Sequence, residues 1–290
     1  MYNLELQKKV KSHKLPDGET VSFWTWTSNA SIAIVTATAA FHWTADGDAA
    51  PVKQFDLAPN LAGAQVINYA VSPDGQWLMC VGIKPSATPG AAAEGCMQLY
   101  SVEKKVSQPL TAHAGCFHAT KLPGRTDTSI LFCFVDQKPG VPPKLMIIEV
   151  GKDRNAPGGV FRLTPVDLPV PADVAGSDFA VAMHASRKHD VLYILTKAGY
   201  AYIFDVPSGG VIFRHRVSET PVFTASVHEA TGGVLAVAAR TGQVMLLTLN
   251  TTALVPYVTN VLRNPALAMS LAARLGLSGA DDLYASQVRG

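Results

Sequence analysis

Charged residues are scarce in this sequence, and the two signs are almost balanced. They make up 16% of the 290 residues, and 24 Lys and Arg against 22 Asp and Glu leave a formal charge of +2. The one dense basic run, residues 8–14, is short and is interrupted by Val10, Ser12 and His13. Because nucleic-acid binding needs a basic face on the protein, we predict no nucleic-acid partner.

Cysteine is also rare, and the spacing of the four cysteines matches neither a zinc site nor a redox motif. All four lie in or beside apolar runs: Cys80, Cys96, Cys116 and Cys133. Free cysteine in such surroundings behaves as a small buried hydrophobic residue. The cysteines therefore predict reduced thiols and a cytoplasmic protein.

Long apolar segments of the kind that enter membranes are missing. Glu5, Lys8 and Lys9 follow Met1 closely, which argues against a secretory signal. The longest uncharged stretch, residues 20–45, contains eleven Ser, Thr, Asn or His residues, and these are costly in hydrocarbon. We expect contact with membranes to be indirect, through partner proteins.

Motifs of catalysis and cofactor binding are absent as well. The sequence contains no Gly-rich phosphate loop, no His-Glu-x-x-His and no Gly-x-Ser-x-Gly. His184 and His189 flank Arg187 and Lys188, whose positive charges oppose a metal ion, so a solvated turn explains them better than a metal site. We predict no catalytic residue, no metal and no cofactor.

Short apolar runs rich in β-branched and aromatic residues recur from Val21 to Leu249, separated by clusters of Gly, Pro, Asp and Asn. This spacing favours many antiparallel strands, and therefore an all-β region. One unit consists of residues 66–71 and 77–83 around the turn Ser72-Pro73-Asp74-Gly75, and it predicts a hairpin. Alternation then places four side chains of its second strand on one face: Trp77, Met79, Val81 and Ile83.

A longer repeat is visible in a segment that combines an apolar strand, a polar turn and a second strand. Six copies occur, at residues 2–5, 41–43, 99–103, 147–150, 203–206 and 245–247. They lie roughly 40 to 57 residues apart, the length of one four-stranded propeller blade. Five intervals predict about five complete blades with a fragment of another at the start. In such a fold the four tryptophans fit the blade core better than a ligand cage: Trp24, Trp26, Trp43 and Trp77.

The composition changes after Val255 towards helix formers. Asn264 followed by Pro265 predicts a helix start, and Gly276 predicts its end. A second helix is expected from Ser278, with Asp281 and Asp282 as first-turn carboxylates rather than paired catalytic acids. We therefore divide the chain into a β-propeller, residues 1–256, and a short α-helical hairpin that begins an α-solenoid, residues 257–290.

Specific segments resemble the terminal domain of the clathrin heavy chain family. They run in the same order from about residue 2 to residue 284, and the clearest are residues 23–26 (FWTW), 52–56 (VKQFD), 61–69 (LAGAQVINY), 97–102 (MQLYSV), 105–109 (KVSQP), 131–134 (LFCF), 147–151 (IIEVG), 188–191 (KHDV), 228–231 (HEAT) and 256–262 (PYVTNVL). Collinear matches over nearly the whole chain are more specific than any single motif.

The resemblance implies a seven-bladed propeller type, of which about five blades are present, in a chain that is incomplete at both its N-terminal and C-terminal ends. It also implies a structural coat protein at coated pits and coated vesicles, whose propeller grooves hold short extended peptides of adaptor and accessory proteins. Trimerisation and light-chain binding belong to family regions that this chain lacks.

The family's peptide-binding residues can be carried over to ten positions. Gln65, Ile67 and Ile83 match a groove for tryptophan-containing peptides. A groove for leucine-rich loops is matched by Trp77, Leu99, Ser107 and Gln108, with Lys104 where the family usually has Arg. Tyr2 and Gln7 stand where the groove for acidic clathrin-box peptides has an aromatic residue and a lysine, so we expect no normal clathrin-box binding.

Two other readings of the sequence stay open at this point. For Ile67, Ile83 and Leu99, a position in the blade core is as consistent with the pattern as a place in a groove. For the whole chain, the alternatives are a different cytoplasmic propeller scaffold and a propeller hydrolase. The lack of recurrent Gly-His and Trp-Asp pairs argues against the first, and the lack of clustered carboxylates argues against the second.

Overall fold

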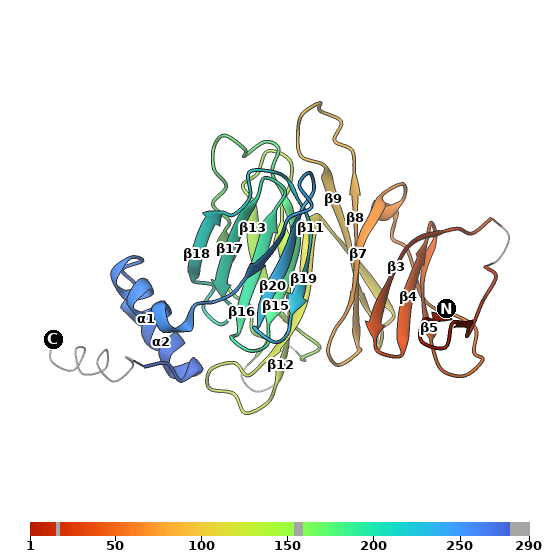
Figure 1. Cartoon of the computed structure of the whole chain (residues 1–290), viewed down its shortest axis with the longest axis horizontal. Coiled ribbons are helices and arrows are strands. Elements are labelled where there is room, and N and C mark those ends of the chain that lie inside the picture. Colours follow the sequence, from red (N-terminus) through yellow and green to blue (C-terminus); the bar gives the residue numbers. More distant parts are fainter. Residues whose placement is uncertain (16–17, 154–158, 279–290) are drawn as a thin grey trace.

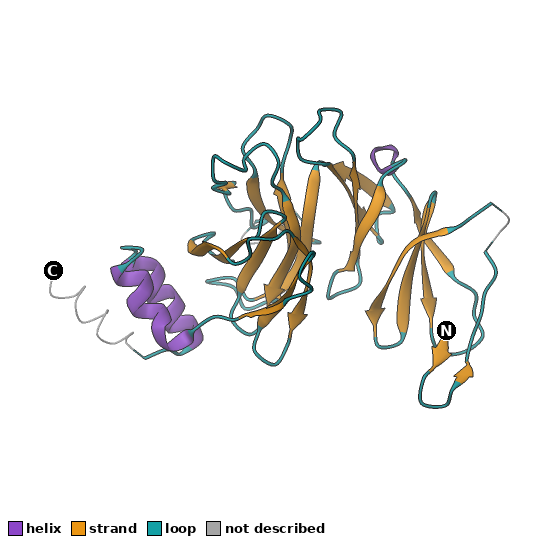
Figure 2. Cartoon of the chain, turned by 45° about the horizontal axis from the view of Figure 1, so that its top comes forward, coloured by secondary structure: helices purple, strands orange, loops and turns teal. Residues whose placement is uncertain are grey.

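The computed structural model of the chain describes residues 1–15, 18–153 and 159–278. Five small antiparallel sheets follow one another along the chain as propeller blades, and two helices come after the last sheet (Figure 1). The helices and the first blade lie at opposite ends of the molecule (Figure 2).

The strands of each blade are consecutive in sequence. The first blade contains β3 (Val21–Ser28), β4 (Ser31–Thr36), β5 (Ala39–Thr44) and β6 (Val52–Asp56). The second contains β7 (Gln65–Val71), β8 (Trp77–Lys84), β9 (Glu94–Ser101) and β10 (Val106–Leu110). The third contains β11 (Ala112–Thr120), β12 (Ser129–Asp136), β13 (Lys144–Val150) and β14 (Val166–Asp167). The fourth contains β15 (Ala180–Ser186), β16 (Val191–Thr196), β17 (Tyr200–Asp205) and β18 (Val211–Arg216). The fifth contains β19 (Val222–His228), β20 (Gly233–Ala238) and β21 (Val244–Leu247).

The predicted repeat is confirmed, because five of its six copies fall on the third strand of a blade: β5, β9, β13, β17 and β21. The first copy falls on a separate hairpin of β1 (Tyr2–Asn3) and β2 (Lys8–Lys9). One detail of the prediction was wrong. The fifth blade has three strands in place of four, because the chain passes from β21 directly into a helix.

The predicted hairpin around residues 72–75 is confirmed as β7 and β8. The Ser72 hydroxyl donates a hydrogen bond to Asp74, whose carboxylate also accepts one from the Gln76 backbone N–H at 3.1 Å. Gly75 has a φ of 71°, the left-handed conformation that this turn requires. A short 3₁₀ turn, η1 (Pro59–Leu61), links the first two blades.

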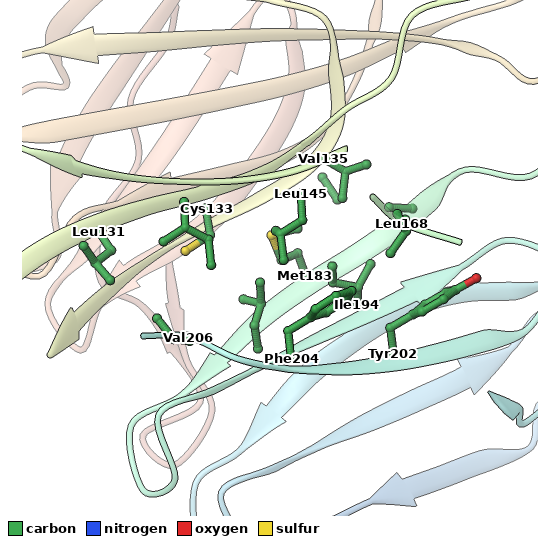
Figure 3. Packing of buried hydrophobic residues seen from close by; sticks show 14 of the residues in the cluster. Leu131, Cys133, Val135, Leu145, Leu168, Met183, Ile194, Tyr202, Phe204 and Val206 are labelled. Atoms are coloured by element: carbon green, nitrogen blue, oxygen red, sulfur yellow. The ribbon is translucent and has the colours of Figure 1, made fainter. Parts of the chain in front are cut away.

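Blades pack face to face, and each seam buries apolar side chains from two neighbouring sheets. The innermost strands contact one another in chain order, β3 with β7, β7 with β11, β11 with β15, and β15 with β19. Figure 3 shows the seam between the third and fourth blades, where Leu131, Cys133 and Leu145 face Met183, Ile194 and Phe204. All four cysteines are free; Cys116 is half-buried and the other three are buried.

The helical hairpin consists of α1 (Thr251–Asn260) and α2 (Pro265–Leu275). The start and end predicted for α2 are confirmed, because the Asn264 side chain accepts a hydrogen bond from Leu267 N–H at 3.0 Å and Gly276 ends the helix with a φ of 61°. The boundary proposed at 256/257 lies inside α1. The helix expected from Ser278, with Asp281 and Asp282, lies outside the described residues.

Two expectations about tryptophans were wrong. Trp43 is buried and Trp77 half-buried, but Trp24 and Trp26 of β3 are 59% and 53% exposed. The physical reason is that, among the described residues, no other blade packs on the sheet face that carries them. The innermost strands of the two terminal blades, β3 and β19, do not pack closely against each other as the other innermost strands do. The described helices include none that is long and apolar enough to cross a bilayer.

Candidate functional site

Most of the predicted peptide-binding residues lie on one face of the second blade, the face that packs against the third blade. Met79 and Leu99 belong to the core of this seam, together with Phe132 and Phe134 of β12. Alternation along β8 and register with its neighbours place six predicted residues on this face: Gln65, Ile67, Ile83, Trp77, Leu99 and Gln108. We call this region the second seam.

One end of the second seam carries the residues predicted for tryptophan-containing peptides. Gln65 and Ile83 are direct partners in the register of β7 and β8. Gln65 is exposed and Ile83 half-buried, whereas Ile67 is half-buried against the core of the seam. This end therefore offers the exposed Gln65 amide for hydrogen bonding, beside the half-buried side chains of Ile67 and Ile83.

The other end carries residues predicted for leucine-rich loops. Trp77 begins β8, six residues before Ile83, so the two ends are roughly 20 Å apart along the strand. Gln108 of the exposed strand β10 is opposite Leu99 in the register. Leu99 is only 5% exposed, so its side chain contributes to the core here, while Trp77 is half-buried near Gly151 of the third blade.

The remaining residues of the leucine-loop set point elsewhere. Ser107 faces the first blade, where its hydroxyl accepts a hydrogen bond from Gln98 Nε2 at 2.8 Å. Gln98 also donates to the Asp56 carbonyl and accepts from Ala58 N–H, so Ser107 is part of a structural network between two blades. Lys104 lies in the exposed turn between β9 and β10.

Tyr2 and Gln7 lie on the separate hairpin of β1 and β2, and both are exposed. Gln7 has a φ of 48°, which places it in the left-handed region at the turn. The structure does not bring either residue to the second seam. They form no common site with the other eight residues.

Sequence reasoning missed two glycines that determine how closely the second and third blades approach. A Cβ at Gly95 would lie 2.6 Å from the Ala112 backbone, and a Cβ at Gly115 would lie 2.9 Å from Met79 and Met97 side-chain atoms. The two blades therefore pack closely both at Gly95, which is opposite Ile83 in the register, and at Gly115 beside Met79. A glycine inside a strand is the sequence signal that indicates such close approach.

A large cleft opens beside the Ile83 end of the second seam. Its volume is about 1110 Å³, and it lies between the β8–β9 loop, the β12–β13 loop and residues 167–176. Lys84, Gly95 and His113 line it, but none of the ten predicted residues does. Clefts of this size commonly hold ligands when convergent polar groups accompany apolar walls.

His113 is the most deeply buried titratable group at this cleft, being 3% exposed. Its Nε2–H donates to the Ala93 carbonyl at 2.6 Å, and its ring stacks on Phe179 at 4.8 Å between centroids. Burial lowers the pKa of His113, although the bond to Ala93 acts in the opposite direction. Because a carbonyl oxygen can only accept, Nε2 is the donor in this hydrogen bond.

A metal centre is not formed by the described residues, which contain no group of three or more His, Cys, Asp or Glu side chains suited to an ion. His184 donates from Nε2 to the Ala225 carbonyl at 2.9 Å, and His189 lies 3.5 Å from the Ser186 hydroxyl. These contacts explain both histidines as structural residues.

Comparison with known proteins gives consistent matches along the chain. The family model described as clathrin, heavy-chain linker, matches residues 252–274, which include most of α1 and α2. The probable clathrin heavy chain 1 of Caenorhabditis elegans is 44% identical over 286 residues, 98% of this chain. The clathrin heavy chain of Drosophila melanogaster is 41% identical over 284 residues, again 98% of this chain. The chain spans only 16% of the length of either relative.

Solved structures support the fold alone. A chain in the crystal structure of a mitotic checkpoint complex superposes with a TM-score of 0.54 at 14% identity, covering 86% of this chain and 67% of that chain.

Proposed function

Because this chain is homologous to the clathrin heavy chains over 98% of its length, we propose that it serves as a structural component of cytoplasmic vesicle coats. Its propeller binds extended peptide segments of adaptor and accessory proteins at the two ends of the second seam. The protein acts by holding partners at coated pits and vesicles, and catalyses no reaction.

The observation that carries this proposal is the position of the predicted residues on one sheet face. Residues from the four consecutive strands of the second blade share the face at which this blade meets the third. The middle of the seam is closed by Met79, Leu99 and Phe132, which are at most 5% exposed. We therefore propose that guest side chains bind at the ends, beside the exposed Gln65 or beside the half-buried Trp77.

Strand β10 supports binding at the Trp77 end. It is the outer strand of the second blade, so one of its edges has no partner strand. Val106 is 60% exposed, and Ser107 and Gln108 are also exposed. An extended peptide can hydrogen-bond such an edge while its side chains occupy neighbouring apolar pockets.

Individual sites of this kind are expected to be weak. A half-open apolar pocket with one amide gives an affinity on the order of micromolar, which many copies in a coat convert into firm attachment. Attachment to membranes follows through the adaptors.

The proposal is tested by titrating labelled peptides against the purified chain. Replacing Gln65 by Ala should lower the affinity for a tryptophan-containing adaptor peptide about fivefold, because one hydrogen bond of about 1 kcal/mol is lost. The same replacement should leave the affinity for a leucine-rich loop peptide unchanged. Gln108→Ala should have the opposite selectivity, and fluorescence anisotropy measures both.

Gln243→Ala is the matched control, since Gln243 is an exposed glutamine of the fifth blade, away from the second seam. It should leave both affinities unchanged. Absence of binding to the unaltered chain, or equal affinities in all variants, would remove the assignment of the second seam.

A further inference from the structure

The loop between β8 and β9, residues 85–93, projects from the second blade at the top of Figure 1. The end of this loop is held, because Ala92 N–H donates a hydrogen bond to the Gly176 carbonyl at 2.9 Å. Residues 87–91, which come before this bond, are all exposed. The loop therefore has a fixed base and an exposed tip, whose side chains another protein can reach.

A tight turn at the tip presents Thr88, which is exposed. The Thr88 carbonyl accepts a hydrogen bond from Ala91 N–H at 3.2 Å, with Pro89 and Gly90 between the two residues. Proline suits the first central position of such a turn, and Gly90 has a φ of 80°, as the second central position of a type II turn requires. The turn thus holds Thr88 in a defined conformation, directly before a proline.

The loop contains two hydroxyl groups, and they differ in availability. Ser86 is half-buried, and its hydroxyl accepts a hydrogen bond from Thr88 N–H at 3.2 Å. The Thr88 hydroxyl has no hydrogen-bond partner among the residues that the structure describes. Thr88 therefore carries the hydroxyl of this loop that is free to react.

Other hydroxyl residues that precede a proline are less accessible than Thr88. They are Ser72, Thr164 and Thr220. Ser72 is 3% exposed and Thr220 is half-buried, and both hydroxyls are hydrogen-bonded. Thr164 is exposed, but its neighbours Leu163 and Val166 pack against the core between the third and fourth blades, which holds the backbone on the blade surface. Thr88 is the one at the tip of a projecting loop.

An exposed threonine followed by a proline is the acceptor pattern of proline-directed serine/threonine kinases, which bind the acceptor through its accessible backbone. We propose that Thr88 is a phosphorylation site for a kinase of this class. The Thr88 Oγ1 attacks the γ-phosphorus of ATP, and the bond from that phosphorus to the bridging oxygen of ADP breaks. ADP leaves with that oxygen, and the hydroxyl proton passes to the catalytic carboxylate of the kinase.

A phosphate on Thr88 changes the charge of the large cleft beside the second seam. Thr88 lines this cleft together with Lys84 and Lys138 and with the carboxylates of Glu94 and Asp167, so the charges of the lining are balanced before modification. The phosphate adds a charge of about −1.5 to −2 and three acceptor oxygens. Lys84 precedes Thr88 in the chain, whereas Lys138 belongs to the β12–β13 loop and is 60% exposed. Binding of the phosphate by both ammonium groups joins the two loops across the cleft.

Hydrogen exchange followed by mass spectrometry tests this consequence. In the chain phosphorylated on Thr88, amides of residues 85–93 and 137–143 should exchange about twofold more slowly, because new charge-assisted hydrogen bonds order both loops. Lys138→Ala should remove the slowing in residues 137–143. Lys8→Ala, at an exposed position of β2, is the control and should retain it. Unchanged exchange after phosphorylation would overturn the link between the two loops.

The site itself is tested by incubating the purified chain and ATP with a mitogen-activated protein kinase and, separately, with a cyclin-dependent protein kinase. Mass spectrometry should find one phosphate per chain, on Thr88. Thr88→Val, which removes the hydroxyl and keeps the shape, should take up none, and Pro89→Ala should be modified more slowly. Thr164→Val is the matched control and should be phosphorylated like the unaltered chain.

A peptide of residues 84–94 shows whether the folded loop presents the site. Modification of this peptide without modification of the folded chain would overturn the proposal, because the loop would then withhold Thr88. The proposal would equally be overturned if neither kinase modified Thr88 in the peptide or the chain, or if the phosphate of the folded chain were found on Thr164.

Discussion

Gly115 shows how a single residue determines how closely two blades approach each other. Its hydrogen leaves room for Met79 and Met97, and these side chains close the middle of the second seam. A side chain at this position would have to displace Met79 and Met97, so the close contact between the second and third blades depends on glycine here.

His113 makes stability depend on pH. Its pKa is lowered in the folded chain, so the unfolded chain binds the proton more readily. Its stabilising contribution is complete above the unfolded pKa of about 6.5 and is lost as the pH falls from there towards the lower folded pKa. His113→Phe keeps the ring against Phe179 but cannot titrate. The free energy of unfolding should therefore fall less steeply between pH 7.5 and 5.5 in this variant.

Urea denaturation at pH 7.5, 6.5 and 5.5 measures this difference in slope. The variant should also be about 1 kcal/mol less stable at pH 7.5, because the hydrogen bond to Ala93 is lost. His215→Phe, at an exposed position, should retain the slope of the unaltered chain. Identical slopes for His113→Phe and the unaltered chain would show that His113 does not titrate on unfolding.

At the level of residues, sequence reasoning located side chains on strand faces but could not give their exposure. Alternation placed Trp77 and Met79 together on one face, as found. The same reasoning treated Trp24 like Trp43, yet one is exposed and the other buried. Burial of a strand residue depends on whether another sheet covers its face, and this is a property of the assembled blades. For the ten predicted site residues, peptide binding stays a prediction.

Helix α2 is attached to the fourth blade by a buried ion pair. Arg274, in its last turn, donates from Nη2 to Asp205, whose side chain is fully buried. Arg274 Nε also lies 3.8 Å from Asp190, which accepts a hydrogen bond from His118 at 2.8 Å. Burial alone would raise the pKa of Asp190, but its bonds to His118 and Thr120 and the nearby charges hold that pKa below its usual value.

Removing Arg274 should loosen the helices. Arg274→Ala leaves Asp205 as a buried charge without its cation, so we expect a loss of about 3 kcal/mol in the free energy of unfolding. Proteolysis within α1 and α2 should accelerate. Adding Asp205→Asn to this variant should recover part of the stability, because the unpaired charge is then gone.

Urea denaturation and limited proteolysis check this expectation. Arg240→Ala, at an exposed position in the fifth blade, serves as the control and should change neither the free energy of unfolding nor the rate of proteolysis. If Arg274→Ala were as stable as the control, the ion pair would contribute nothing to the attachment of the helices.

The sequence predicted the ends of α2 but did not predict α1, because only α2 has recognisable capping residues. Asn264, Pro265 and Gly276 mark the ends of α2, and all three act as expected. In α1, Pro256 lies in the interior, where it removes a backbone hydrogen bond. The helix forms nevertheless because Leu254 and Val258 are buried against the fourth and fifth blades. Tertiary packing of this kind is not visible in the local pattern.

The whole molecule is an arc in which each blade is stabilised by its neighbours. Inner blades are covered on both faces, whereas the first and fifth blades are covered on one. Stability in such arrays is approximately a sum over blades and the seams between them. Backbone amides should therefore exchange most slowly in the third blade and fastest in the terminal blades.

Hydrogen exchange followed by mass spectrometry measures this gradient at low concentration. Equal exchange in all five blades at low concentration would indicate a single cooperative unit and contradict the additive description.

The number of blades could be predicted because each blade repeats a strand of similar composition at a regular interval. The openness of the arc could not, since the repeat gives the order of blades but not the angle between them.

The contact of Arg274 with Asp205 also determines how mechanical load would pass through the molecule. The backbone leads from the helices into β21 of the fifth blade, but the ion pair joins α2 to β17 of the fourth. A force applied to the end of α2 is therefore transmitted both through the backbone to the fifth blade and through the ion pair to the fourth blade. The three-stranded fifth blade thus carries only part of this force.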